Sequence, residues 1–297
     1  MKKIYIKNIL LFITFLIGLS IFLYPIVTGF LSYQDGLEKI KIYEKNAVEI
    51  KEEDYSEIIA NAHKYNADLI TKGEIMLDEE ERYYNQLNVA NADIMGYIYI
   101  EKLNIDLPVY HGIEEETLQV GVGHFQGSSL PVGGYGTHCA LFGHRGLPTS
   151  KLFTNLDKLR DGDIFVLKVL KEKLYYKVDQ IVVIEPDEIW DYIGIEQNRD
   201  LVTLVTCTPY GINTQRLLIR GTRTTEQTHD LENIFNKNYR NNILILITIF
   251  LIVIILISAV VMKIHQRSKR QRRKFARHEL IKKEGAKTSD KKETDFF

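Results

Sequence analysis

The chain of 297 residues has only two cysteines, Cys139 and Cys207. Two thiols are too few for a disulfide-rich scaffold, so the fold needs a hydrophobic core. The chain also lacks internal repeats and low-complexity tracts, while 45% of its residues are hydrophobic and 26% are charged. These proportions are typical of one or two globular domains and exclude a disordered or fibrous protein.

The net charge is small, and its distribution excludes a nucleic-acid-binding body. The chain has 38 Lys and Arg against 39 Asp and Glu, which gives a formal net charge of −1. Basic residues gather at the two ends, at Lys2, Lys3 and Lys7 and in 263–297, which leaves the middle strongly acidic. Because an acidic surface repels phosphates, we expect no nucleic-acid partner.

Two long stretches of the sequence, 8–32 and 243–262, contain no charged residue. At about 1.5 Å per residue, each can cross a hydrocarbon core of about 30 Å, so the sequence predicts two transmembrane helices. The first stretch could instead be a cleaved signal peptide. Its apolar run exceeds the usual ~7–15 residues, however, and no clear small-residue cleavage site follows it, which favours an uncleaved anchor.

Basic residues flank both predicted spans on what must be the same side of the membrane. Lys2, Lys3 and Lys7 precede the first span, and a basic cluster opens the tail 263–297 after the second. Since basic flanks stay in the cytoplasm, we expect both termini there and 33–241 outside. The expected protein is a two-pass protein of the cell membrane whose tail also contacts anionic lipid.

The region between the spans changes its pattern partway along. Apolar residues at helical spacing over 36–70 predict one or two helices, and the Gly, Asn and acidic stretch 71–93 predicts a loop or linker. From residue 95 onward, short β-branched and aromatic runs alternate with turn residues, which predicts an all-β barrel or sandwich. A short helix is expected over 149–160.

These changes in pattern divide the chain into seven segments. The expected boundaries are 1–7 (cytoplasmic N-terminus), 8–32 (transmembrane helix), 33–92 (helical and linker or lid-like region), 93–225 (catalytic β-barrel), 226–242 (juxtamembrane linker), 243–262 (transmembrane helix) and 263–297 (basic cytoplasmic tail).

Three polar residues stand where predicted strands end. Cys207 closes the run LVTLVTC just before the turn residues PYGIN. Arg216 opens the next run nine residues later, so a hairpin between the two runs would bring the guanidinium beside the sulfur. His144 ends the run HCALFGH before a turn, and it can also project from a strand end.

These three residue types together can perform acyl transfer. A cysteine thiol with the usual pKa of about 8.5 is mostly protonated near neutral pH unless a nearby cation favours the thiolate. As a thiolate, Cys207 can attack a carbonyl carbon, His144 can protonate the leaving amine, and Arg216 can hold the oxyanion with its fork of donors. The sequence therefore indicates a membrane-tethered cysteine enzyme, without deciding whether water or an amine resolves the thioester.

Structural roles for the same residues stay open at this point. A cysteine at a strand end is often a small buried hydrophobe, and an arginine in a hairpin often forms a surface ion pair. Outside the cytoplasm, Cys139 and Cys207 could form a disulfide that removes the nucleophile, although strand alternation favours a buried free thiol for Cys139. The other histidines lack metal-ligand spacing, so we expect no zinc site.

The sequence resembles a known family in three stretches: VGHFQGSSLPVGG at 122–134, GHRGLP at 143–148, and TLVTC at 203–207 with its continuation TPYGINTQRLLIRGTR. Over roughly 93–223 these are similar to the pilus-associated class C sortases of Gram-positive bacteria. A membrane span after the domain as well as before it is also similar to that class. The resemblance implies a mainly β fold: an eight-stranded sortase-type β-barrel with N-terminal helices, flanked by two transmembrane helices.

The resemblance also implies an activity. In that family a cysteine transpeptidase, formally a thiol protease, cleaves LPxTG-like sorting signals of surface or pilin proteins. Cys207 matches the nucleophile, His144 the proton donor and acceptor, and Arg216 the residue that stabilises the oxyanion. An amine acceptor, in this class commonly a pilin lysine, opens the thioester and joins pilin subunits during pilus assembly. Neither a metal nor an organic cofactor is implied.

Three other functions fit parts of the same pattern. The first is a sortase that anchors surface proteins to the cell wall through an amine of the wall peptide. The second is a membrane-bound cysteine protease with the same three residues. The third is an ectodomain for adhesion or reception without catalysis, in which replacement of Cys207 would have no effect.

One feature of the class is missing from the sequence. Class C members usually carry an Asp-Pro-aromatic lid ahead of the barrel, and 71–88 contains no such tripeptide. Either the lid is absent, or another segment within 76–84 covers the active site, with Tyr83 or Tyr84 as the plug. The second hypothesis predicts that deletion of 74–84 speeds the cleavage of a short sorting-signal peptide.

Overall fold

The protein is described by a computed structural model whose chain divides into two units, residues 1–18 with 236–297, and residues 19–235. The whole β-barrel belongs to the second unit, together with the helical residues from 19 onward that pack on it. The described residues are 2–72, 80–89, 92–148, 150–226, 244, 247–248, 250–263, 265–267, 269–270 and 273.

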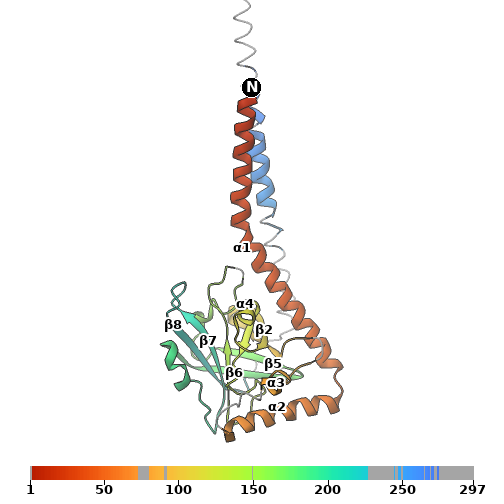
Figure 1. The fold of residues 1–297 in the computed structure, drawn as a ribbon, viewed down its shortest axis with the longest axis vertical. Helices are drawn as coiled ribbons and strands as arrows, with labels where there is room; N and C mark the ends of the chain where they lie inside the picture. Colours follow the sequence, from red (N-terminus) through yellow and green to blue (C-terminus); the bar gives the residue numbers. More distant parts are fainter. Residues whose placement is uncertain are drawn as a thin grey trace, which may run out of the picture. The chain divides into compact units, whose positions relative to one another are not determined.

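Eight strands close into a barrel (Figure 1). They are β1 (Gly96–Ile100), β2 (Ile105–His111), β3 (Val122–His124), β4 (Thr137–Phe142), β5 (Ile164–Val169), β6 (Glu172–Ile184), β7 (Asp200–Thr208) and β8 (Gln215–Arg223). Around the barrel the order is β1-β2-β3-β4-β7-β8-β6-β5, and β5 pairs with β1. β2 runs parallel to β3, and β4 runs parallel to β7. The expected eight-stranded barrel is confirmed.

Seven of these strands fall on short β-branched and aromatic runs of the sequence: GYIYIEKL, DLPVYHG, HCALFGH, GDIFVLKVL, KLYYKVDQIVVI, LVTLVTC and RLLIRGTR. The exception is β3, which has three residues and is too short to show an alternating pattern. Its conformation and place in the barrel are set instead by hydrogen-bonded pairing with a strand on each side. Val122 lies opposite Val109 of β2, and Gly123 lies opposite Phe142 of β4.

Two hydrophobic clusters cover the two faces of the barrel wall. Val202 and Leu204 of β7 point into the main core, which fills the barrel interior. Because successive residues of a strand point to opposite faces, Val205 lies on the outside, where it joins a smaller cluster. That outer cluster is covered by the 3-10 helix η4 (Pro186–Asp191), and its buried members are Ala140, Ile184, Ile189, Ile193, Val205 and Leu218.

Helices ahead of the barrel complete the main core. Ile40 and Tyr43 of α1, and Ala62 and Tyr65 of α2, are buried in it, which confirms the helices expected over 36–70. A short helix, α3, forms within the stretch expected to be a loop, of which 73–79 and 90–91 lie outside the described residues. The bounds are α1 (Lys2–Glu49), α2 (Glu52–Lys72) and α3 (Glu80–Tyr84).

The helix expected over 149–160 is wrong. Residues 152–155 form turns, followed by one 3-10 turn, η3 (Leu156–Lys158). The φ of Leu152 is +29°, which an α-helix does not allow. Leu152, Phe153 and Leu156 are all buried, so their spacing reflects a compact turn packed on the core.

Two further short elements were not predicted from the sequence. The helix α4 (Glu115–Val120) lies in the crossover between the parallel strands β2 and β3. The 3-10 helix η2 (Glu101–Leu103) lies in the turn from β1 to β2 and ends at Asn104, whose φ is +54°. Both are too short for a hydrophobic period to develop.

Two helices are long and apolar enough to cross a membrane. They span Phe12–Glu49, within α1, and Phe250–Arg267, with mean hydropathies of 2.0 and 1.8. No side chain in either apolar window is buried inside the protein, so both could face lipid. These helices fit the two predicted spans, while 243, 245–246, 249 and all of 274–297 lie outside the described residues.

One buried tyrosine provides a test of how α1 is joined to the barrel. The Tyr43 hydroxyl donates to Met95 O at 3.0 Å and accepts from Leu170 N at 2.7 Å, and the residue is 0% exposed. Tyr43→Phe leaves the buried Leu170 N–H without its acceptor, so we expect the free energy of unfolding to fall by ~1–3 kcal/mol. Urea denaturation of the full chain in detergent measures this change.

The matched control for this prediction is Tyr135→Phe. Tyr135 is 87% exposed, so the same chemical change there should stay within about 0.5 kcal/mol. Equal effects of the two substitutions would show that the hydroxyl of Tyr43 does not stabilise the contact between α1 and the barrel.

Candidate active site

Cys207 and Arg216 face each other across the β7–β8 hairpin. The two strands are antiparallel, and Cys207 is the direct partner of Arg216. Directly opposite residues project from the same face of a sheet with Cβ atoms about 4.5–5.5 Å apart. The predicted hairpin is therefore confirmed, and it makes Cys207 and Arg216 direct neighbours on one face of the sheet.

His144 stands on the other side of Cys207, in the loop after β4. In the parallel β4–β7 pair, Phe142 lies opposite Val205. Continuing this register by two residues brings the backbone of His144 level with that of Cys207. The three predicted site residues thus come from neighbouring segments at one end of the barrel.

Hydrogen bonds extend the β4–β7 register beyond the end of β4. The Gly143 N–H donates to Val205 O at 3.0 Å, and Thr206 Oγ1 donates to Gly143 O at 2.7 Å. One step further, Arg145 Nη1 donates to Thr208 Oγ1 at 3.2 Å. Residues on either side of His144 are therefore tied to the strand that carries Cys207.

Two glycines allow the loop around His144 to pack tightly. A Cβ on Gly143 would meet the Phe153 ring at 2.6 Å, closer than real Cβ atoms come. Gly146 has a φ of +77°, which favours glycine, and a Cβ on it would lie 3.1 Å from the Tyr210 ring. The Phe153 N–H also donates to His144 O at 3.1 Å, so the loop is held from both sides.

Glu115 contacts His144, and the sequence did not predict it. Its Oε2 lies 3.2 Å from His144 Nε2. A carboxylate can only accept, so this contact requires a proton on Nε2. A hydrogen bond from Gln119 and the charge of His144 lower the pKa of Glu115. An acidic run at 114–116 is visible in the sequence, but only the β2–β3 crossover brings it to the histidine.

The guanidinium of Arg216 keeps donors available beside Cys207. Its Nη1 donates to Asn213 O at 3.3 Å and to Gln215 O at 3.1 Å. Within the described part of the chain, Nε and Nη2 have no hydrogen-bond partner. These free donors belong to a half-buried side chain on the face of Cys207, where they can reach a negatively charged oxygen.

The two cysteines are both free, and their environments differ. Cys139 lies opposite Val202, five residues before Cys207 on β7, which corresponds to about 16 Å along the strand. A disulfide needs Cα atoms within about 7 Å, so the disulfide alternative is wrong. Burial raises the pKa of Cys139, which is 3% exposed, whereas Cys207 is half-buried. The buried free thiol expected for Cys139 is confirmed.

An apolar surface adjoins Cys207 on the outer face of the barrel. Val205, two residues earlier on the same face, belongs to the outer cluster, against which Phe142 packs. The Phe125 ring lies 5.9 Å from that of Phe142 and 5.3 Å from that of Trp190. Trp190 is 61% exposed, so this surface can bind apolar side chains of a peptide.

Tyr83 is a core residue and does not cover the thiol. It is 0% exposed, and its hydroxyl lies 2.9 Å from Gly112 N and 2.9 Å from His124 O. Its ring stacks on the imidazole of His124. The hypothesis that Tyr83 acts as a plug is wrong, because its ring packs in the core and its hydroxyl is hydrogen-bonded there. Deletion of 74–84 would remove this core residue and destabilise the fold.

Tyr84 packs beside the same cluster. Its ring centroid lies 5.1 Å from that of Tyr83 and 5.7 Å from that of His111 on β2. Of the other residues of the hypothesised lid, 80–82 belong to α3 and 76–79 lie outside the described residues.

Three other histidines of the barrel have structural roles. One ring nitrogen of each is hydrogen-bonded to a backbone carbonyl oxygen: His111 to Gln86 O, His124 to Ser129 O, and His138 to Gly194 O. Burial lowers the pKa of all three, that of His124 to about 4, so they are neutral at physiological pH. Within the described ranges, no group of three or more His, Cys, Asp or Glu side chains could hold a metal ion.

Comparison with known proteins identifies the family. Residues 98–224 match the sortase domain model. Sortase D of Bacillus subtilis is 27% identical over 133 residues, which cover 44% of this chain and 64% of that protein, a little under two thirds of its length.

Two crystal structures are more similar. Sortase C1 from Streptococcus agalactiae is 46% identical with a TM-score of 0.61, covering 63% of this chain and 98% of that chain. Clostridium perfringens sortase C with the C-terminal cell wall sorting motif is also 46% identical, with a TM-score of 0.57, covering 64% of this chain and 100% of that chain. The chain belongs to the sortase family of cysteine transpeptidases, and within that family to the class C sortases.

Proposed function

We propose that this protein is a membrane-anchored transpeptidase that cleaves an LPxTG-like sorting signal and transfers the acyl product to an amine, a pilin lysine. The observation that carries the proposal is the placement of Cys207 opposite Arg216 and level with His144. A related sortase C was crystallised with a C-terminal cell wall sorting motif, which supports the substrate class.

The first half of the reaction forms a thioester on Cys207. The thiolate attacks the Thr carbonyl carbon of the signal, and the carbonyl oxygen becomes an oxyanion that the free donors of Arg216 can hold. When the tetrahedral intermediate collapses, the Thr–Gly C–N bond breaks. His144 donates a proton to the leaving Gly amine, so a neutral amine departs. The apolar surface around Val205 can bind the apolar residues of the signal.

The second half of the reaction transfers the acyl group to an amine. A neutral lysine amine attacks the thioester carbon, and the resulting C–N bond is an isopeptide bond. The Cys207 thiolate leaves, and the proton lost by the amine returns to His144. Membership of class C favours a pilin lysine as the acceptor, and hence pilus polymerisation.

The membrane helices would place this chemistry outside the cell. The basic residues before the first span and after the second favour cytoplasmic termini. The catalytic domain then stands on the outer face of the membrane, tethered at both ends, where exported substrates emerge with their sorting signals.

Peptide products test the proposed function directly. The full chain in detergent is incubated with an LPxTG-type peptide, with and without an amine acceptor, and the products are identified by mass spectrometry. We expect the acceptor to be joined to the Thr carboxyl group. Hydrolysis alone in the presence of a pilin lysine peptide would indicate a cysteine protease. Transfer to a wall-type amine but not to a pilin lysine would indicate cell-wall anchoring.

Cysteine substitutions test the identity of the nucleophile. Cys207→Ala should abolish the acyl-enzyme adduct, because no other described thiol is accessible at that end of the barrel. Mass spectrometry of protein quenched during turnover measures the adduct. The matched control is Cys139→Ala, which removes a buried thiol elsewhere in the barrel and should keep the adduct. An adduct that persists in Cys207→Ala would exclude this cysteine as the nucleophile.

Replacement of His144 tests the proton transfer. Without an acid to protonate the leaving amine, His144→Ala should slow acyl-enzyme formation by about 10²–10⁴. The rate of release of the glycine-terminated fragment measures this step. His138→Ala is not a suitable control, because its buried ring supports the fold. The exposed His63 is suitable, and a loss in His63→Ala equal to that in His144→Ala would contradict a specific role.

Arginine substitutions test the stabilisation of the oxyanion. Arg216→Lys keeps the charge but loses the planar fork of donors, so kcat/KM should fall by ~10²–10³. The matched control is Arg220→Lys, four residues along the same face of β8, where the partners are Asp179 and Glu196. If Arg216→Lys is nearly as active as the native protein, Arg216 contributes only its charge.

A further inference from the structure

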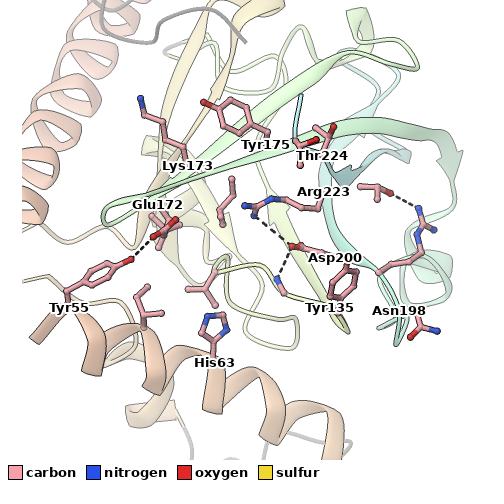
Figure 2. Close-up of a pocket in the computed structure, with 18 residues that line it drawn as sticks. Tyr55, His63, Tyr135, Glu172, Lys173, Tyr175, Asn198, Asp200, Arg223 and Thr224 are labelled. Atoms are coloured by element: carbon pink, nitrogen blue, oxygen red, sulfur yellow. Dashed lines mark hydrogen bonds and ion pairs between the residues drawn. The ribbon is translucent and has the colours of Figure 1, made fainter. Parts of the chain in front are cut away.

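A cavity opens at the end of the β7–β8 hairpin remote from Cys207. It has a volume of about 840 Å³ and is lined by α2, the start of β7 and the end of β8 (Figure 2). Asp200, on its wall, precedes Cys207 by seven residues on β7, which corresponds to about 23 Å. The cavity is therefore separate from the candidate active site.

The two carboxylates of the cavity wall already have protein donors. Asp200 Oδ1 accepts from Tyr176 OH at 2.9 Å, and Asp200 Oδ2 accepts from Gly134 N at 2.8 Å. Glu172 Oε1 accepts from Tyr55 OH at 2.8 Å. Because these acceptors are occupied, a ligand does not have to supply donors to them.

Arg223, in contrast, has guanidinium N–H groups with no hydrogen-bond partner among the residues that the structure describes. Its Nη1 lies 3.8 Å from Asp200 Oδ2, beyond hydrogen-bond distance, and its guanidinium stacks over the Tyr176 ring. Figure 2 shows the Arg223 side chain reaching into the cavity from β8, while His63 reaches toward it from α2. The other arginine of the lining, Arg199, is engaged by carboxylates outside the cavity. An anionic group would therefore bind at Arg223.

The remaining lining suits a peptide. Three tyrosines and several aliphatic side chains surround the polar groups, and a cavity of this size holds a molecule of a few residues. Rings and aliphatic chains can bind an apolar side chain while the guanidinium fork binds a carboxylate. The tyrosines are Tyr55, Tyr135 and Tyr175, and the aliphatic residues are Ile59, Val132, Val169 and Leu174.

The charge of the wall favours a carboxylate over a phosphate. The lining has three basic side chains, Lys173, Arg199 and Arg223, and two acidic ones, Glu172 and Asp200. Because Arg199 is paired with carboxylates outside the cavity, Glu172 and Asp200 balance Lys173 and Arg223, and the two acidic side chains repel a dianion more strongly than a monoanion.

We propose that this cavity is a second peptide-binding site, which takes a short segment with a carboxylate next to an apolar side chain. The carboxylate binds the guanidinium of Arg223, and the apolar side chain packs between α2 and the barrel. The site needs neither Cys207 nor turnover, so it goes beyond the proposed transpeptidase reaction. An extended substrate bound at Cys207 would reach it only through about seven further residues.

The test measures peptide binding to the full-length Cys207→Ala protein in nanodiscs, so that no turnover occurs. Isothermal titration calorimetry follows three unlabelled, N-acetylated peptides: Leu-Glu-Leu-amide, Leu-Gln-Leu-amide, and Leu-Gln-Leu with a free C-terminal carboxylate. We expect Leu-Gln-Leu-amide, which has no carboxylate, to bind at least about tenfold more weakly than the tighter-binding of the two carboxylate peptides. It lacks the charge-assisted hydrogen bonds to Arg223. The two anionic peptides distinguish a side-chain carboxylate from a chain terminus.

Substitutions on opposite walls locate the binding. Arg223→Gln should weaken the carboxylate peptide at least about tenfold, and Arg160→Gln, an arginine outside the cavity, should leave binding unchanged. Arg223 also lies near the buried carboxylate of Asp200, so its replacement changes the stability of the barrel as well as the cavity. A second variant, His63→Trp, fills the cavity from an exposed position of α2 and should also weaken peptide binding. Lys64→Trp, at the neighbouring exposed position that does not line the cavity, is its control.

Three results would overturn the proposal. The first is equal binding of the neutral and anionic peptides. The second is unchanged affinity in both Arg223→Gln and His63→Trp. The third is displacement of the peptide by an equal concentration of glycerol phosphate, which would assign the cavity to a phosphate ligand. Since the assay uses Cys207→Ala, none of these results bears on whether the transpeptidase function is right.

Discussion

The register of β7 between its two neighbours is the constraint on which the site depends. β8 places Arg216 directly opposite Cys207, and the parallel strand β4 leads into His144 at the same level. Because side chains alternate between faces, a slip of one residue would turn Cys207 into the barrel core. The core prevents such a slip, since Val202 and Leu204 are 0% exposed on the inner face of the same strand. Hydrophobic packing inside the barrel thus fixes polar geometry outside it.

The two ends of the β7–β8 hairpin carry different chemistry on one rigid support. At one end Arg216 lies beside a half-buried thiol, and at the other Arg223 lies near the buried carboxylate of Asp200. Burial raises the pKa of Asp200, while hydrogen bonds from Gly134 and Tyr176 lower it. A closed barrel has no free edge strand, so binding of a peptide by strand addition is not available to it. Loops and cavities at the two ends therefore supply its binding surfaces.

Local patterns in the sequence predicted the parts of the site that depend on neighbours in the chain. The run before Cys207 and the run after the turn pair as a hairpin, so nine residues of spacing were enough to predict the contact with Arg216. The contact of Glu115 with His144 could not be predicted, because it depends on a parallel crossover that joins distant segments. The cavity at Arg223 escaped prediction for the same reason, since α2 forms one of its walls. The predicted helix over 149–160 failed because buried leucines of a compact turn have the same spacing as a helix face.

The environments of the two cysteines explain why residue type alone does not identify a nucleophile. Both lie on strands of the same sheet, and both are free. Cys139 points into the core, where desolvation disfavours its thiolate and no substrate can reach it. Cys207 lies on the outer face, at a strand end, where its immediate neighbours across the sheet are a guanidinium and an imidazole-bearing loop. The fold therefore places one cysteine in the core and the other at a half-buried strand end, through strand parity and position along the barrel.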